Sequence, residues 1–252
     1  MTEHVLVERR GERLAITMNR PERRNAITVA MYAAIADALE AAASDESIRV
    51  ITLEGAGVDF TGGNDLADFM NELPQDGSDI PVWRLLRALA LNEVPLIAAV
   101  HGNAVGIGTT MLFHCDLVIA EEGTRFVMPF TDLGLVPEAA SSLVLPRLAG
   151  RREAAKYLLL GEPFGVDDAQ RIGLVSHRAA AGQLTAELER VVGALLAKPA
   201  QALRLTQRLL RGTSQDEVLE RMTWENSHFS ERLTSDEVKA AITAFFSARA
   251  AR

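Results

Sequence analysis

The stretch HGNAVGIGTTM, residues 101–111, decides the fold. The apolar run PLIAAV before it predicts a buried strand, its glycines predict a turn, and TTMLFHC predicts a helix. A strand–turn–helix junction of this kind presents unpaired backbone N–H groups to a ligand. Only Thr109 and Thr110 follow the turn directly, so an acid or base for catalysis must come from another part of the chain.

The segments on both sides of this junction alternate between strands and helices. Upstream, HVLVERR and LAITMNR predict a hairpin through Gly11, apolar residues recurring from Ile27 to Leu39 predict a long helix, and IRVITLEG predicts a buried strand. Downstream, DLVIAEE and RFVMP predict strands, and EAASSLVLPRLAG predicts a helix with Pro137 suited to its first turn. This alternation indicates an α/β architecture with parallel pairing.

The C-terminal part of the chain has a different pattern. From about residue 183 the strands stop, and four successive segments beginning with LTAELERVVGALLA are helical. We therefore expect two regions: a core over residues 1–182 that holds the site, and a helical region over residues 183–252 that covers the site or mediates assembly. Residues 71–81 are polar, contain two prolines and are predicted to form a mobile loop.

Composition limits the possible functions. Hydrophobic residues make up 48% and charged residues 24% of the chain, as in ordinary globular proteins. The net charge of -8 argues against nucleic acid as a main partner. No apolar run is long enough for a membrane span, and the N-terminus has no apolar signal region. The single cysteine precludes an internal disulfide, and we expect a cytoplasmic protein.

Two segments share one design. DFTGGNDL and HGNAVGIGTT each pass through glycines just before a helix, where unpaired N–H groups and a partial positive charge lie. Taken singly, each is weak evidence, because a glycine turn is usually only a turn. Two such turns facing one another would form an oxyanion hole.

The order of NRPERRNA, FTGGNDL, AAVHGNAVGIG, HCDLVIA, LGLVP and LLLGEPFGVDDAQRIGLV resembles the crotonase superfamily, the enoyl-CoA hydratase/isomerase family. The resemblance covers nearly the whole chain. It implies a spiral of ββα units, a helical C-terminal trimerisation region and a homotrimer or dimer of trimers. It also implies an acyl-CoA thioester substrate, with coenzyme A as part of the substrate and no separate cofactor. By position, the oxyanion donors are the amides of Asn64 and Ile107.

The chain departs from the hydratase pattern at both catalytic glutamates. The first position is Thr110 and the second is Phe130, neither of which can activate water or supply a proton at neutral pH. A carboxylate does occur in PEAASS, residues 137–142. This segment, with GNDL and AVGIG, resembles the peroxisomal branch of the delta-3,delta-2-enoyl-CoA isomerases, whose single catalytic glutamate maps to Glu138.

Glu138 also has an interpretation without catalysis, as a carboxylate that favours the dipole of the following helix. Its apolar neighbours would raise its pKa and a helix terminus would lower it, and the sequence leaves the balance open. Asp132 is the rival carboxylate. His101 and His114 are predicted to be satisfied core or turn residues, and no cluster has metal-ligand spacing.

The remaining candidates line the expected substrate path. Arg23 and Arg24 could meet the phosphates of coenzyme A or be solvated, and Asp65 is expected to brace its turn. The predicted substrate-binding residues are Arg24, Ala26, Gly62, Gly63, Asp65, Leu66, Gly106, Thr110 and Phe130. The leading hypothesis is an enoyl-CoA isomerase. The alternatives are another crotonase-type reaction, such as weak hydration, ring isomerisation or thioester hydrolysis, and an acyl-CoA-binding scaffold without catalysis.

Overall fold

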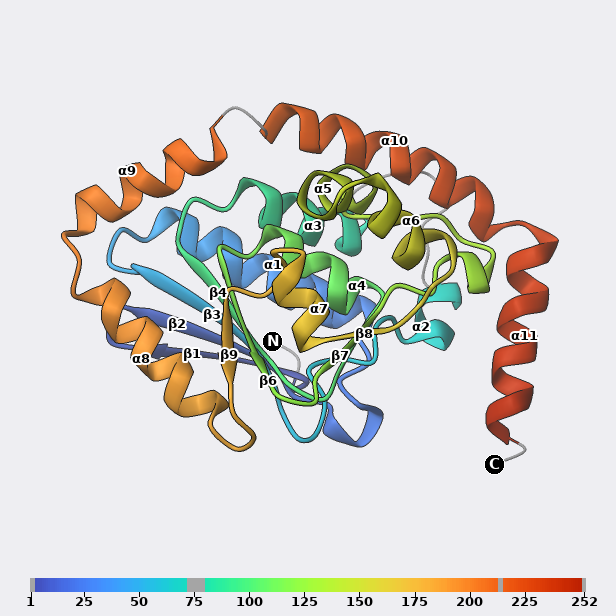
Figure 1. Cartoon of the computed structure of the whole chain (residues 1–252), viewed down its shortest axis with the longest axis horizontal. Helices are drawn as coiled ribbons and strands as arrows, with labels where there is room; N and C mark the ends of the chain where they lie inside the picture. Colours follow the sequence, from blue (N-terminus) through green and yellow to red (C-terminus); the bar gives the residue numbers. More distant parts are fainter. Residues whose placement is uncertain (1–2, 72–79, 213–214, 251–252) are drawn as a thin grey trace.

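The fold is given by a computed structural model, which describes residues 3–71, 80–212 and 215–250 (Figure 1). The strands are β1 Val5–Arg10, β2 Arg13–Met18, β3 Val50–Gly55, β4 Leu96–Val100, β5 Asn103–Val105, β6 Leu117–Glu121, β7 Arg125–Val127, β8 Phe164–Gly165 and β9 His177–Ala179. The helices of the core are α1 Val29–Ser44, α2 Leu66–Asn71, α3 Pro81–Leu91, α4 Ile107–Thr110, α5 Ser141–Ala149, α6 Arg151–Leu159 and α7 Val166–Arg171. Short 3-10 helices are η1 Pro21–Arg23, η2 Met111–His114 and η3 Thr131–Leu133.

The main sheet has the strand order β1-β2-β3-β4-β6-β9. Only the β1–β2 hairpin is antiparallel, and every later pairing in this sheet is parallel. The sequence therefore predicted both the hairpin through Gly11 and the parallel α/β architecture correctly. A smaller sheet of order β5-β7-β8 begins directly after β4, so the junction at residues 101–111 leads from one sheet to the other.

Side chains of the main sheet alternate between two helical layers, as a strand period of two requires. On β4, Ile97 and Ala99 face α8 (Leu184–Leu196), where they pack with Val191 and Val192. The intervening residues of β4 belong to the larger core on the opposite side, which includes α1 and α3. Because both faces of the sheet are covered, its central strands read as continuous apolar runs.

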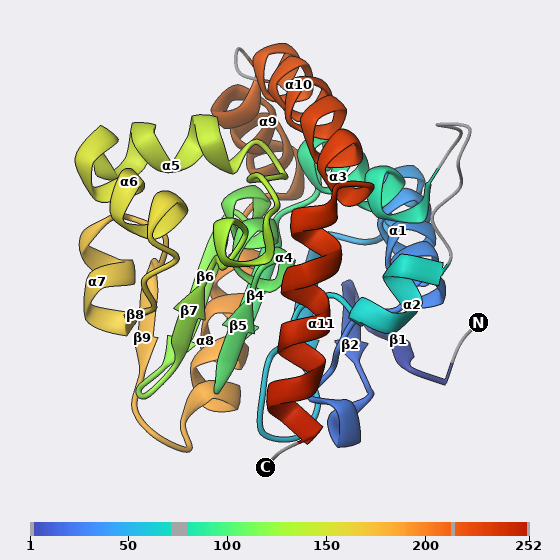
Figure 2. The ribbon, with the colours of Figure 1, turned by 90° about the vertical axis from the view of Figure 1, so that its right-hand side faces the viewer.

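In the C-terminal region the described residues form the helices α8, α9 Ala200–Arg211, α10 Gln215–Leu233 and α11 Asp236–Ala250, joined by short turns. Helix α8 completes the packing of the main sheet, whereas α10 contacts α3 and α5, and α11 contacts η3. Figure 2 faces α11 and shows it running down the molecule from the end of α10. The division at residue 182 falls between β9 and α8, and the separate role of the second region remains a prediction.

Three predicted helix boundaries were wrong. The long helix begins at Val29 rather than at Ile27, because Ile27 forms a β-bridge with Asn64 and Thr28 caps the helix. The helix after the glycine turn begins at Ile107 and becomes a 3-10 helix at Met111.

The third error bears on the site, because it concerns the segment of the proposed base. Helix α5 begins at Ser141, so Pro137 and Glu138 lie in an irregular turn before it instead of in its first turn. The reason is local backbone geometry: Ala139 and Ala140 have φ of 58° and 55°, in the left-handed region that interrupts a right-handed helix. The loop predicted over residues 71–81 lies for the most part outside the described residues, at 72–79.

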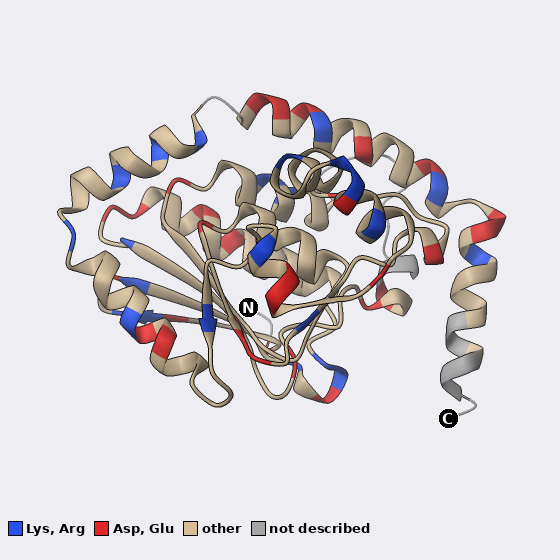
Figure 3. Ribbon diagram, in the orientation of Figure 1, with Lys and Arg blue, Asp and Glu red and all other residues tan. Residues whose placement is uncertain are grey.

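Basic and acidic residues are interspersed in the fold, and several of them form ion pairs. In the view of Figure 3, Lys and Arg are interspersed with Asp and Glu along α10 and over the α/β body. The arginines of α9 pair with acids of that body, for example Arg208 with Glu93 and Arg211 with Asp116. Within the described ranges, no helix is long and apolar enough to cross a membrane.

Candidate active site

A cavity of about 730 Å³ lies between the two glycine turns, the turn before α5 and the C-terminal helices. Both predicted N–H donor residues and the proposed base, Asn64, Ile107 and Glu138, line it. Of the predicted substrate-binding residues, the cavity is lined by Arg24, Ala26, Gly62, Gly63, Asp65, Leu66, Gly106 and Phe130. Thr110 is the exception, since it lies behind the wall and contacts Glu138.

The two glycine turns are joined directly to one another. Thr61 and Ala104 form a parallel β-bridge, in which Val105 donates its N–H to the Thr61 carbonyl at 3.1 Å. Gly63 has φ of +85°, and a Cβ there would lie 2.7 Å from the Val105 carbonyl oxygen. Only glycine fits this conformation and this close approach, so Gly63 sets how near the two turns lie.

The N–H groups of Asn64 and Ile107 are left available by the local structure. In the bridge between Ile27 and Asn64, the bonds run from Ile27 N–H to the Gly63 carbonyl and from Asp65 N–H to the Ile27 carbonyl. Asn64 therefore directs its own N–H away from this bridge. Ile107 is the first residue of α4, where an N–H has no intrahelical partner. Neither N–H has an acceptor in the described part of the chain.

The first turn is braced from the side, as expected for Asp65. Its carboxylate accepts a hydrogen bond from Arg20 Nη1 at 2.7 Å and another from the backbone N–H of Asp68 at 3.4 Å. A contact not predicted from the sequence holds the side chain of Asn64, whose Oδ1 accepts a hydrogen bond from the buried hydroxyl of Tyr32 on α1. Tyr32 is 1% exposed, and its apolar neighbours gave no signal of this role.

Glu138 is 5% exposed. The hydroxyl of Thr110 donates a hydrogen bond to Oε1, whereas Oε2 has no hydrogen-bond partner among the described residues. Burial raises the pKa of Glu138 to about 8 from an ordinary value of 4.5, the Thr110 hydrogen bond opposes this shift, and the negative charge of Glu225 adds to it. The balance that the sequence left open therefore favours a raised pKa.

Apolar side chains form much of the wall near Glu138. Phe130, at the position of the second hydratase glutamate, is 6% exposed and lines the cavity. Trp83 of α3 and Phe229 of α10 meet edge to face, with ring centroids 6.4 Å apart. Further apolar lining residues include Val82, Leu133, Leu135, Leu233 and Ile242. Trp83 and Phe229 were not singled out from the sequence, because only the tertiary packing of α3 against α10 brings them together.

The other candidates occupy less enclosed positions. Asp132 lines the cavity but is exposed, which distinguishes it from Glu138. Arg23 and Arg24 line the cavity as well, and the side chain of Arg24 is 69% exposed with its Nε 3.7 Å from Oδ2 of Asp59.

The predicted structural role of His114 is confirmed. Its Nε2 lies 2.8 Å from the carbonyl oxygen of Ala139, and burial lowers the pKa of His114 to about 4, so the ring is neutral and donates this hydrogen bond. His101 bonds the Gly57 carbonyl through Nε2.

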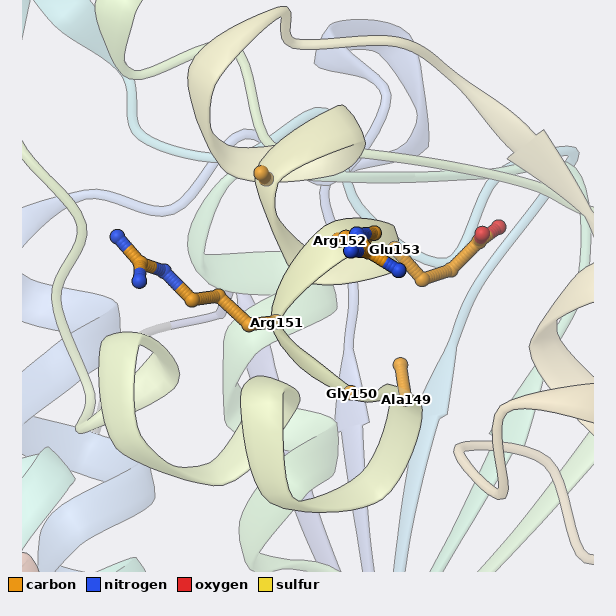
Figure 4. A pocket seen from close by; sticks show the side chains of 6 residues that line it. Ala149, Gly150, Arg151, Arg152 and Glu153 are labelled. Carbon is orange, nitrogen blue, oxygen red and sulfur yellow. The ribbon is translucent and has the colours of Figure 1, made fainter.

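A second hollow, of about 720 Å³, lies between α5 and α6. It is lined by the backbone turn at Gly150 and by charged side chains that do not converge, since Arg151 and Glu153 extend in opposite directions (Figure 4). Among the residues that the structure describes, no group of three His, Cys, Asp or Glu could hold a metal ion.

Comparison with known proteins agrees with this geometry. The model of the family described as enoyl-CoA hydratase/isomerase matches residues 9–252. The chain belongs to this family, which acts on acyl-CoA thioesters. The crystal structure of an enoyl-CoA hydratase/isomerase from Pseudoalteromonas atlantica T6c superposes with a TM-score of 0.93 at 39% identity, covering 97% of each chain. The predicted crotonase-like fold is thereby confirmed.

Relatives with assigned names differ in their reactions. Enoyl-CoA delta isomerase 2 from Rattus norvegicus is 32% identical over 247 residues, which cover 96% of this chain and 63% of that protein. The 2,3-dehydroadipyl-CoA hydratase of Escherichia coli K12 is also 32% identical over 247 residues, covering 97% of this chain and 96% of the relative. Similarity thus defines the family but does not choose between isomerisation and hydration.

Proposed function

We propose that this chain is an enoyl-CoA isomerase that moves a double bond from the 3-position to the 2-position of an acyl-CoA thioester. The observation that supports the proposal is the set of groups in one cavity: a buried carboxylate, Glu138, whose Oε2 has no partner among the described residues, and the available N–H groups of Asn64 and Ile107. A single carboxylate suffices for isomerisation, because one group can both remove and return the proton.

The first step removes a proton from the α-carbon. Ionised Glu138 takes the proton from C2 of the 3-enoyl thioester, and the electron pair of the broken C–H bond spreads over the thioester and the C3–C4 double bond as a dienolate. The N–H groups of Asn64 and Ile107 donate hydrogen bonds to the dienolate oxygen, and each donor of this kind contributes about 10²–10³-fold to the rate.

The second step returns the same proton to the γ-carbon. Neutral Glu138 protonates C4, and the electrons of the dienolate form the C2–C3 double bond, which is conjugated with the thioester. No water or other reactant enters, so atoms and charge balance within substrate and enzyme. A pKa of about 8 suits this exchange, because the carboxyl group must be a base in one step and an acid in the next.

Hydration is disfavoured by the same site. It needs one group to activate water and another to protonate the α-carbon, but the two hydratase positions hold Thr110 and Phe130. Thr110 already donates its hydrogen bond to Glu138, and Phe130 adds an apolar surface to the cavity. Water near Glu138 would therefore meet no second acid or base at these positions.

The proposed function is tested by assaying 3-enoyl-CoA and 2-enoyl-CoA in parallel. Isomerisation predicts that the absorbance of the conjugated thioester rises with the 3-enoyl substrate and that no 3-hydroxyacyl product forms from either substrate. Hydration of 2-enoyl-CoA would overturn the proposal in favour of a hydratase. Binding of both thioesters without turnover would identify a scaffold.

We also propose that the chain assembles as a homotrimer or a dimer of trimers. Helix α9 exposes Leu205, Leu209 and Leu210, whose exposed fractions are 50%, 83% and 75%. Leucines at such exposure on one helix are typical of a surface that packs on another subunit. Val218 of α10, by contrast, packs partly against the chain's own core.

A further inference from the structure

We infer that Glu225 of α10 is a positioning residue for Glu138: its carboxylate holds the backbone turn that directs the proposed base into the cavity. The inference rests on the proposed function, and it assigns to the C-terminal region a part in the active site. Glu225 itself does not line the cavity.

Within the described residues, the hydrogen bonds of Glu225 all go to the turn that follows Glu138 and to the start of α5. Oε2 accepts the N–H of Ala140 at 2.6 Å, and Oε1 accepts the N–H and the hydroxyl of Ser142 at 3.0 and 2.5 Å. Glu225 is 6% exposed, so these hydrogen bonds are shielded from water. Helix α5 has no side-chain cap of its own at Ala140, and a carboxylate from α10 therefore serves as its N-terminal cap.

The turn needs this support because its backbone is unfavourable. Ala139 and Ala140 both adopt the left-handed region, where a Cβ is penalised and where glycine is usual. Glu225 binds the second of these residues through its N–H, and His114 binds the carbonyl of the first at 2.8 Å. Glu138 immediately precedes the pair, and its carbonyl accepts the N–H and hydroxyl of Ser141. Without Glu225, the turn would lose the contact that opposes relaxation of Ala140.

Glu225 also acts on Glu138 by its charge. The charged and titratable groups around the base are Glu225 and Arg221 on α10, Tyr32 on α1 and the neutral His114 on η2, with Asp132 at the exposed side of the cavity. Among them, Glu225 is the carboxylate whose negative charge raises the pKa of Glu138. Removing that charge should therefore lower the pH at which Glu138 ionises.

Glu225→Gln and Glu225→Asp separate geometry from charge. The Gln variant places an amide N–H₂ opposite N–H groups of the turn and removes the charge. The Asp variant keeps the charge but shortens the reach. We expect kcat to fall by about 10²-fold in both, as for a misplaced catalytic group, with KM changed little. The midpoint of kcat/KM against pH should move to lower pH only in Glu225→Gln.

Glu217→Gln is the matched control. Glu217 also joins α10 to α5, through an exposed ion pair with Arg147, but it does not touch the turn after Glu138. This variant should retain the kcat and the pH midpoint of the unchanged protein. If Glu225→Gln fails to fold, Ser142→Ala removes the hydroxyl that donates to Oε1 and accepts from Arg221 Nη1 at 3.3 Å, and it keeps the Ser142 N–H. This variant should lower kcat with KM unchanged.

A measurement without turnover separates this inference from the proposed function. The infrared carboxyl band that disappears in Glu138→Gln reports the ionisation of Glu138 directly, and it should titrate at lower pH in Glu225→Gln. Unchanged kcat in both Glu225 variants would overturn the inference, as would a lower kcat in Glu225→Gln with an unmoved infrared midpoint. Absence of isomerase activity in the unchanged protein, with the infrared shift present, would overturn the proposed reaction instead.

Discussion

The hydroxyl of Thr110 donates a hydrogen bond to Oε1 of Glu138, across 28 positions of the sequence. Ile107 is the first residue of α4 and Thr110 is the last. The hydrogen bond therefore joins the helix that carries one proposed N–H donor to the proposed base. It uses one oxygen of the carboxylate and leaves Oε2 without a partner in the described part of the chain. The hydratase pattern has its first glutamate at this position, whereas here the position holds the group that orients the only buried acid among the residues shown to line the cavity.

The first prediction concerns pH. Because Glu138 must be ionised to remove a proton, kcat/KM for isomerisation should rise with pH and level off above about 8. The Thr110 hydrogen bond favours the ionised form, so Thr110→Val should move the midpoint to higher pH by about 1 unit. Thr223→Val, which removes an exposed hydroxyl on α10, is the control and should leave the profile unchanged. A shift to lower pH in Thr110→Val would contradict the assignment.

The second prediction concerns stability. The pKa of Glu138 is about 8 in the folded chain and near 4.5 when the chain unfolds, so the folded state binds more protons between these values. The free energy of unfolding contributed by this group is therefore present below pH 4.5 and is lost as pH rises to 8. Glu138→Gln lacks this loss, and its Tm should exceed that of the unchanged protein more at pH 9 than at pH 5.

Each kcal/mol of this difference corresponds to about 2–4 °C in Tm for a chain of this size. Asp132→Asn is the matched control, because Asp132 lines the same cavity but is exposed, and its effect on Tm should not grow in this way. A Tm difference for Glu138→Gln that is equal at both pH values would show that Glu138 is ionised throughout.

The sequence predicted most strands and helices up to residue 149, the four C-terminal helices and most residues that line the candidate cavity, because their signals are local. The short elements β5, α6, α7, β8 and β9 were not predicted. Apolar runs identified β3, β4 and β6, and positive-φ glycines such as Gly63 and Gly106 marked the two turns. The motif around Glu138 identified the candidate base even though the predicted helix boundary there was wrong.

The missed features depend on contacts between segments far apart in the sequence. In the sequence, Tyr32 belongs to the apolar pattern of α1, and only the folded chain brings its hydroxyl to Asn64. In the same way, Glu225 reads as a polar residue of an amphipathic helix, and only the packing of α10 on α5 brings its carboxylate to Ala140. The start of α5 could not be predicted because Ala139 and Ala140 are good helix formers. In the folded chain these two residues have positive φ, and their backbone groups bond His114 and Glu225 of other elements.

The third prediction concerns the joined turns. Gly63→Ala would place a Cβ 2.7 Å from the Val105 carbonyl oxygen, at a φ of +85° that disfavours alanine. The turn must shift to relieve the short contact and the unfavourable backbone conformation. Because Asn64 moves with it, kcat/KM should fall by about 10²–10³-fold, as when an oxyanion donor is lost. Gly165→Ala is the control, since a Cβ there meets nothing within 4 Å and φ is negative. Full activity in Gly63→Ala would exclude a role for the Asn64 N–H.

The fourth prediction concerns assembly. Light scattering at micromolar concentration should give the mass of a trimer or a hexamer, and Leu209→Glu on α9 should lower it by placing a charge in the interface. Val58→Glu changes another exposed apolar residue, 74% exposed in a loop of the core, and should leave the mass unchanged. A monomeric mass for the unchanged chain would contradict the proposal.

The most direct test of the central claim is the isomerase turnover of Glu138→Gln beside Asp132→Asn. The Gln side chain keeps the size and polarity of Glu138 and can still accept the Thr110 hydrogen bond, but it cannot take a proton. We predict that Glu138→Gln lowers kcat by about 10²–10⁴-fold with little change in acyl-CoA affinity, and that Asp132→Asn loses far less. Unchanged isomerase activity in Glu138→Gln, with activity abolished in Asp132→Asn, would contradict the account.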